Sequence, residues 1–174
     1  MCIGAIIIAA FYITSVLMAT ASGFLFRISD NSFNSALVLI QTVGFVALWT
    51  TANWAVATLL SGIGKLKEIF TVICYSIIPM VFGNIIYIIF SYMLNADEGE
   101  FLLIFVTAMQ LYSVFMVIVG SIIIHDVSFG RFLAITLLTL IGIIIIIFLF
   151  VLIVIFFQQA AAFAATLWRE IFFR

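Results

Sequence analysis

Long runs of hydrophobic residues, separated by short polar segments, dominate the sequence. A helix needs about 20 mostly apolar residues to cross a membrane. Five runs reach that length, at about residues 3–26, 36–60, 69–94, 101–124 and 131–157. Backbone polar groups in a bilayer must pair within their own segment, and the alternation typical of a membrane β-barrel is absent. The pattern predicts an all-α polytopic membrane protein, a bundle of five transmembrane helices in a single domain over 1–174.

The segment 158–174 has a different pattern. Its bulky apolar residues fall at positions i, i+4, i+5 and i+8, which form one helical stripe, and its charged residues lie off that stripe. This spacing predicts a short amphipathic helix at the membrane interface, with Trp168 at the depth of the headgroups.

Small and polar residues mark the helix faces that we expect to meet other helices, because small residues allow close approach and polar ones hydrogen-bond across the contact. The row in the second run consists of Gln41, Gly44, Leu48, Thr51, Ala55, Thr58 and Gly62. The row in the third run consists of Ser76, Met80, Asn84, Tyr87 and Ser91. In the fourth run, Ser113 and Gly120 share a face with Gln110 nearby. We expect the amides of Gln41, Asn53, Asn84 and Gln110 to point into the bundle, since unpaired polar groups are costly in lipid.

Pro79, the only proline, lies inside the third run. It removes one backbone hydrogen bond and predicts a kink, near which the Tyr75 hydroxyl is placed to hydrogen-bond. The kink serves either packing shape or, alternatively, a hinge or cavity for a substrate.

The loop Gly62-Ile63-Gly64-Lys65 superficially resembles a phosphate-binding loop, but it lacks the GxxxxGK[ST] spacing and any preceding strand. We interpret it as a tight turn in which the glycines supply backbone freedom and Lys65 anchors at the interface. A docking role for this loop stays open.

His125, the only histidine, precedes Asp126 at the end of the fourth run. We interpret it as a polar helix end at the membrane surface, with a pH-responsive or partner-binding role as the alternative. The acidic turn 95–100 is interpreted as solvated, with cation binding as the alternative. Cys2 and Cys74 are far apart and have no metal-ligand spacing. We therefore predict no catalytic residues, no metal and no cofactor.

Composition narrows the function further. The 174 residues are 68% hydrophobic and 7% charged, with a net charge of −1, so no nucleic-acid partner is expected. Basic residues divide equally between the two sides of the predicted bundle, so charge alone does not orient it. The chain begins directly inside an apolar run, and we expect a cytoplasmic tail to precede it in the natural protein.

Taken in order, several short segments resemble the Yip1 domain family, in its bacterial (Bacillota-type) branch, over about 150 residues. They are Gly23-Phe24-Leu25-Phe26, Leu48-Trp49 with Asn53-Trp54, Gly62-Ile63-Gly64-Lys65, Cys74-Tyr75-Ser76-Ile77-Ile78-Pro79, Asp97-Glu98-Gly99, Gly120 with His125, and Gln158-Gln159 with Arg169–Arg174. The chain departs from the family at Ser61 and Ile63, where acidic residues are common. The resemblance implies a cell-membrane protein with its N-terminus cytoplasmic and its C-terminus outside.

Three functions are open at this point. The first is a non-enzymatic scaffold or accessory protein that pairs with itself or another membrane protein. The second is a small permease or channel component, for example accessory to a sugar-uptake transporter, as the resemblance implies for some bacterial members. The third, an intramembrane hydrolase, lacks a nucleophile and base. The resemblance also links eukaryotic members to small GTPases in vesicle traffic, a role we do not carry over.

Overall fold

Six helices make up the regular structure of residues 2–23, 33–60, 63–95 and 98–172, which are the residues that the computed structural model describes. They are α1 (Cys2–Thr20), α2 (Ser35–Leu59), α3 (Leu66–Ser76), α4 (Ile78–Phe90), α5 (Gly99–His125) and α6 (Phe129–Phe172). With α3 and α4 taken as one interrupted span, five of them are long and apolar enough to cross a membrane. The predicted all-α, five-span architecture is confirmed.

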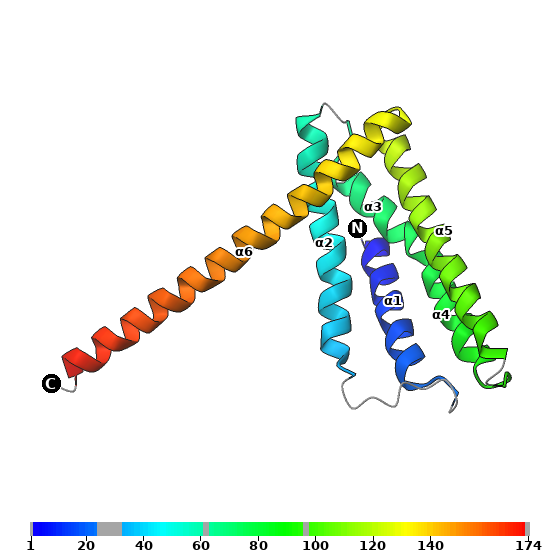
Figure 1. Cartoon of the computed structure of the whole chain (residues 1–174), viewed down its shortest axis with the longest axis horizontal. Coiled ribbons are helices and arrows are strands. Elements are labelled where there is room, and N and C mark those ends of the chain that lie inside the picture. The colour runs from blue at the N-terminus through cyan, green and yellow to red at the C-terminus, as the bar shows by residue number, and fades with distance from the viewer. Residues whose placement is uncertain (1, 24–32, 61–62, 96–97, 173–174) are drawn as a thin grey trace.

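The bundle is built around α3 and α4, which lie end to end (Figure 1). α1 packs on both of them, α2 packs on α1 and α3, and α5 packs on α3 and α4. Successive spans alternate in direction, so the C-terminal ends of α2 and α5 lie at one end of the bundle and those of α1 and α4 at the other (Figure 1). We call these the upper and lower ends, as they appear in Figure 1.

The predicted kink at Pro79 is a complete interruption of the helix. α3 ends at Ser76, α4 begins at Ile78, and Ile77 caps both. Pro79 falls in the first turn of α4, where its missing N–H costs nothing because that N–H has no helical partner. Tyr75 is 44% exposed, and its hydroxyl has no hydrogen bond to any residue that the structure describes.

Glycines set the closest approaches between helices. A Cβ at Gly120 on α5 would lie 2.6 Å from Val72 Cγ1 on α3, and one at Gly4 on α1 would lie 2.7 Å from Phe70 Cε1. These contacts leave no room for a methyl group, as expected where small residues let helix backbones approach.

The three predicted contact faces had different outcomes. On α5, Ser113 is buried and Gly120 lies against Val72, whereas Gln110 is exposed. The row on the third span is confirmed, because Ser76, Asn84 and Ser91 are buried along α3 and α4. The row on α2 is wrong, since Gln41, Thr51, Ala55 and Thr58 are exposed and the buried face is a different one. That face consists of Val46, Thr50, Asn53 and Ala57, at positions i, i+4, i+7 and i+11.

The predicted separate helix at 158–174 is also wrong as an element, because α6 continues unbroken from Phe129 to Phe172. Gln158 and Gln159 end the apolar run, but a drop in hydropathy does not end a helix. The following alanines, Leu167 and Arg169 are strong helix formers, and neither glycine nor proline interrupts them. The interfacial position of this segment stays a prediction.

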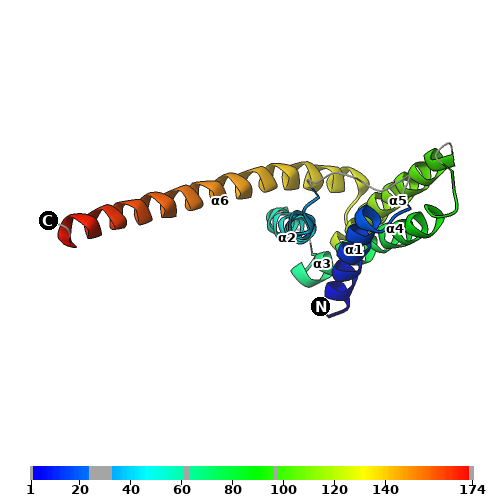
Figure 2. The same cartoon turned by 90° about the horizontal axis from the view of Figure 1, so that it is seen from below.

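α6 leaves the bundle after its first few turns (Figures 1 and 2). Its buried residues are Phe132, Ile135 and Thr139, and it packs mainly on α2. The helix has 44 residues, about 66 Å at 1.5 Å per residue, while a bilayer core is about 30 Å thick. More than half of α6, residues 147–172, is exposed.

Replacing Gly120 with alanine is expected to lower the free energy of unfolding by about 1–3 kcal/mol, because the added methyl overpacks against the β-branched Val72. The matched control is Gly44→Ala in α2, where a Cβ meets nothing within 4 Å and helix propensity slightly favours alanine. Unfolding in mild detergent, followed by circular dichroism, measures both. Equal stability of the two variants would contradict this packing.

Candidate functional site

A buried polar cluster joins α2, α5 and α6 at the upper end of the bundle. His125 and Asn53 are each 1% exposed, and Thr139 is fully buried. His125 Nε2 lies 2.9 Å from Asn53 Oδ1, and Asn53 Nδ2 lies 3.4 Å from Thr139 Oγ1. The three side chains form a chain of hydrogen bonds across three helices.

The directions of these hydrogen bonds follow from the donors available. The Thr139 hydroxyl donates its proton to the Ile135 carbonyl at 2.7 Å, so it accepts from the Asn53 amide nitrogen. The Asn53 amide oxygen then faces His125 and only accepts. His125 Nε2 therefore carries a proton and donates it.

His125 reaches this position because α5 ends there. Asp126 adopts a left-handed conformation (φ 48°, ψ 50°) as the cap of α5, and its backbone N–H bonds back to Ile123. Aspartate tolerates this conformation better than most residues. His125 is the last residue of α5, as the predicted polar helix end requires, but its side chain is buried in the bundle and Asp126 is the exposed residue of the pair. Its place at the membrane surface stays a prediction.

Gly64 closes the other side of the histidine ring. A Cβ at Gly64 would lie 2.7 Å from Cε1 and Nδ1 of His125 and from Ile124 Cγ2. Its φ is not positive, so the expected need for backbone freedom is not the reason for glycine at this position. Gly64 is required because the loop backbone packs directly on His125. Gly62 lies outside the described residues.

The loop leads directly into α3. Lys65 is the N-cap of α3, and its backbone N–H donates to the Glu68 carboxylate at 3.0 Å. The helix therefore begins earlier than the predicted start of the third span at about residue 69, since Lys67 and Glu68 belong to the first turn of α3. The Lys65 side chain is exposed and available to the interface or to a partner.

Several buried polar atoms have no partner among the described residues, including Trp49 Nε1 and Thr50 Oγ1 on α2, and two more lie close to the cluster. One is His125 Nδ1, which faces Gly64, and the other is Thr136 Oγ1 on α6. No group of three His, Cys, Asp or Glu side chains that could hold a metal occurs within the described ranges. Chemically, the cluster can position three helices and a loop, but it does not pair a nucleophile with a base.

A second polar cluster lies between α1 and α4. Asn84 Nδ2 donates to Ser15 Oγ at 3.2 Å and to Thr14 Oγ1 at 3.4 Å. Nearer the lower end, Ser91 Oγ accepts from the Gly23 backbone N–H at 2.8 Å. The expectation that Asn53 and Asn84 point into the bundle is confirmed, while Gln41 and Gln110 are exposed and contradict it.

Of the remaining predicted residues, Trp49 lies one turn from Asn53 on α2 and packs beside the core cluster of Val46, Ile69 and Ile73. It also borders a half-open cavity of about 400 Å³ between α2, α3, α4 and α5, where Ser113 and the exposed Gln110 lie on the α5 wall. Asn53 and Asn84 do not line it. The amides of Asn53, Asn84 and Gln110 thus do not lie along one cavity.

Sequence reasoning missed the partners of the two asparagines, namely Thr139, Thr14 and Ser15. Each is separated from its asparagine by about 70 to 86 residues, and a hydroxyl in an apolar run gives no sign of which helix it faces. The usable signal was only that each asparagine requires some partner in lipid.

Comparison with known proteins gives one match. The model of the Yip1 domain family matches residues 1–153, which includes every helix of the bundle and the first half of α6. No curated protein and no solved structure matches the chain.

Replacing Asn53 with leucine is expected to lower the free energy of unfolding by about 1–2 kcal/mol, because His125 Nε2 loses its acceptor while remaining buried. The control is Thr51→Ala on the exposed side of α2, where the hydroxyl bonds only to its own helix. Its effect should stay within about 0.5 kcal/mol. Denaturation in mild detergent measures both, and equal losses would show that the cluster does not stabilise the bundle.

Gly64→Ala should displace His125 and thereby weaken the same hydrogen bond. The double variant Gly64→Ala, Asn53→Leu is therefore expected to lose less stability than the sum of the single losses. Gly130→Ala serves as the control, since a Cβ there meets nothing within 4 Å. If the stability losses of the two single variants add up exactly in the double variant, Gly64 does not act on the hydrogen bond between His125 and Asn53.

Proposed function

This chain belongs to the Yip1 domain family, and on that basis we propose that it is a non-enzymatic scaffold or accessory protein of the membrane. It would act through contacts between its helices and those of a membrane partner, either another protein or a second copy. The proposal includes a cell-membrane location with the N-terminus cytoplasmic and the C-terminus outside.

The observation that carries the proposal is α6. Residues 147–172 of α6 are all exposed. Lipid alone can cover an apolar helix, but the end of this one is not merely apolar. Its alanines at 160–162, 164 and 165 offer a surface for close helix packing, and Gln158 and Gln159 can hydrogen-bond across it.

The polar cluster supports the same function. A helix that presents a surface to a partner needs a fixed direction, and α6 has few contacts with α5. The hydrogen bond from Asn53 to Thr139, with the buried Ile135 one turn earlier, fixes the first turns of α6 on α2. We therefore propose that the cluster holds the first turns of α6 on α2 and so fixes the direction of the helix.

The alternative function, a small permease or channel component, is favoured by the cavity between α2 and α5. Its walls include Ser76, Gln110 and Ser113, but most lining residues are apolar. Uptake of a small neutral solute by proteoliposomes, abolished by Ser113→Trp, would support this alternative over the scaffold.

The scaffold is tested by photo-crosslinking in native membranes, with benzoylphenylalanine placed at Phe148 or Phe156 on α6. These positions are 61% and 66% exposed, and Leu111 on α5, also 66% exposed, is the matched control. We expect a discrete protein adduct from the α6 positions and none from Leu111. The mass of the adduct distinguishes a second copy from another protein, and lipid adducts alone at all three positions would refute the scaffold.

A further inference from the structure

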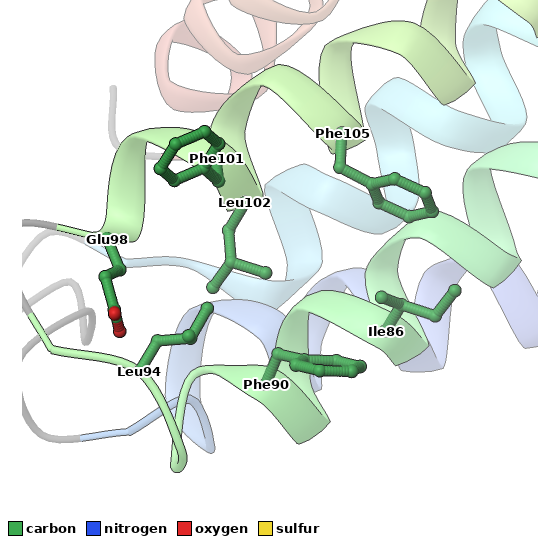
Figure 3. Close-up of a pocket in the computed structure, with 7 residues that line it drawn as sticks. All are labelled: Ile86, Phe90, Leu94, Glu98, Phe101, Leu102 and Phe105. Carbon is green, nitrogen blue, oxygen red and sulfur yellow. The ribbon is translucent and has the colours of Figure 1, made fainter.

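An apolar groove of about 560 Å³ lies between α4 and α5 near the lower end of the bundle. Figure 3 shows its lining side chains in two rows, with Ile86, Phe90 and Leu94 on one side and Phe101, Leu102 and Phe105 on the other. The groove is independent of the polar cluster, which lies at the upper end.

One charged group borders this groove. Glu98 lies at one end of it, and Ile86 and Phe105 lie at the other (Figure 3). One Glu98 oxygen accepts from the Asn95 backbone N–H at 3.2 Å, and the side chain is exposed. The groove thus combines an apolar floor with a carboxylate at its mouth.

The N-terminus of α5 also lies at this mouth, with Glu98 as its N-cap residue and Glu100 in its first turn. The Glu98 side chain makes no capping hydrogen bond to the helix. The first N–H groups of a helix lack helical partners and favour an anion such as phosphate. A carboxylate and a helix N-terminus side by side complement a ligand that carries both charges.

The position of the groove matches the position of a lipid. Glu98 precedes the first residue of a predicted span, and the groove runs along that span to Phe105, about two helical turns away. A lipid whose head lies at the membrane surface has its chain at this depth.

We propose that the groove binds a phospholipid with a primary ammonium headgroup, of the phosphatidylethanolamine class. One acyl chain lies along the two apolar rows, the phosphate lies near the start of α5, and the ammonium contacts Glu98. This site goes beyond the proposed scaffold function and does not depend on it.

The headgroup assignment follows from hydrogen-bond chemistry. A primary ammonium has three N–H donors and makes charge-assisted hydrogen bonds to a carboxylate. The trimethylated ammonium of a choline lipid has no donor and keeps only the charge. An anionic glycerol headgroup has a phosphate but no cation for Glu98.

Native mass spectrometry of the full chain in mild detergent provides the test. The protein is titrated with dioleoyl lipids that differ only in the headgroup: ethanolamine, choline or glycerol. We expect the ethanolamine lipid to bind about threefold more tightly than the choline lipid, or better, as a partly exposed charged pair allows. The glycerol lipid should be weaker than the ethanolamine lipid.

Two variants locate the preference. Glu98→Gln should bring the ethanolamine-to-choline ratio close to one, whereas Glu100→Gln, in the same helical turn but outside the groove lining, should preserve it. Ile86→Phe narrows the apolar part and should weaken binding of all three lipids. Circular dichroism and thermal unfolding verify that each variant is folded.

Several outcomes would overturn the proposal. Equal binding of the ethanolamine and choline lipids by the unaltered chain would mean that the groove binds acyl chains without recognising the headgroup. Tightest binding of the glycerol lipid would assign the site to the helix N-terminus alone. An unchanged preference in folded Glu98→Gln would place the headgroup site elsewhere.

Discussion

The structure depends on one constraint, which is that polar side chains buried in an apolar bundle are stabilised by hydrogen-bonding to one another. In lipid, the hydrophobic effect does not hold helices together, so packing and hydrogen bonds between helices carry the association. Asn53 satisfies this constraint in two directions, toward His125 on α5 and toward Thr139 on α6. Without it, α6 would keep its apolar contacts with α2 but lose the directional bond that selects one orientation.

The features that were predictable from sequence are local ones. Five spans followed from run length, and the interruption at Pro79 followed from the chemistry of one residue. The buried row on α3 and α4 was also predictable, because these central helices have neighbours on several sides. In such a position, a polar row such as Ser76, Asn84 and Ser91 has to face protein.

The errors have physical causes too. α2 has neighbours on only part of its surface, and its exposed threonines satisfy themselves by bonding to their own helix, as Thr51 does to Ala47. A hydroxyl that is paired locally does not need a protein neighbour, so the small and polar row on α2 carried no information about its buried face. The His125 contact with Asn53 spans 72 positions of sequence, and no local pattern encodes it.

Gly64 was correctly singled out from the sequence as important, but the reason given for it was wrong. Its place in a Gly-x-Gly turn suggested conformational freedom, yet its backbone does not use that freedom. The space for its missing side chain is occupied by the buried ring of His125. No local pattern indicates this contact, since only the folded chain brings the loop and the end of α5 together.

The two proposed binding surfaces lie on different parts of the molecule. α6 projects from one side of the bundle, and α4 and α5 form the other side, in both views (Figures 1 and 2). Few contacts join α5 to α6, and the polar cluster lies at the upper end, away from Glu98 at the lower one. A lipid in the α4–α5 groove therefore does not compete with a partner on α6. One connection between them runs along α5 to His125, which contacts Asn53 of the polar cluster, and another runs from α4 through α1 and α3 to α2, on which α6 packs.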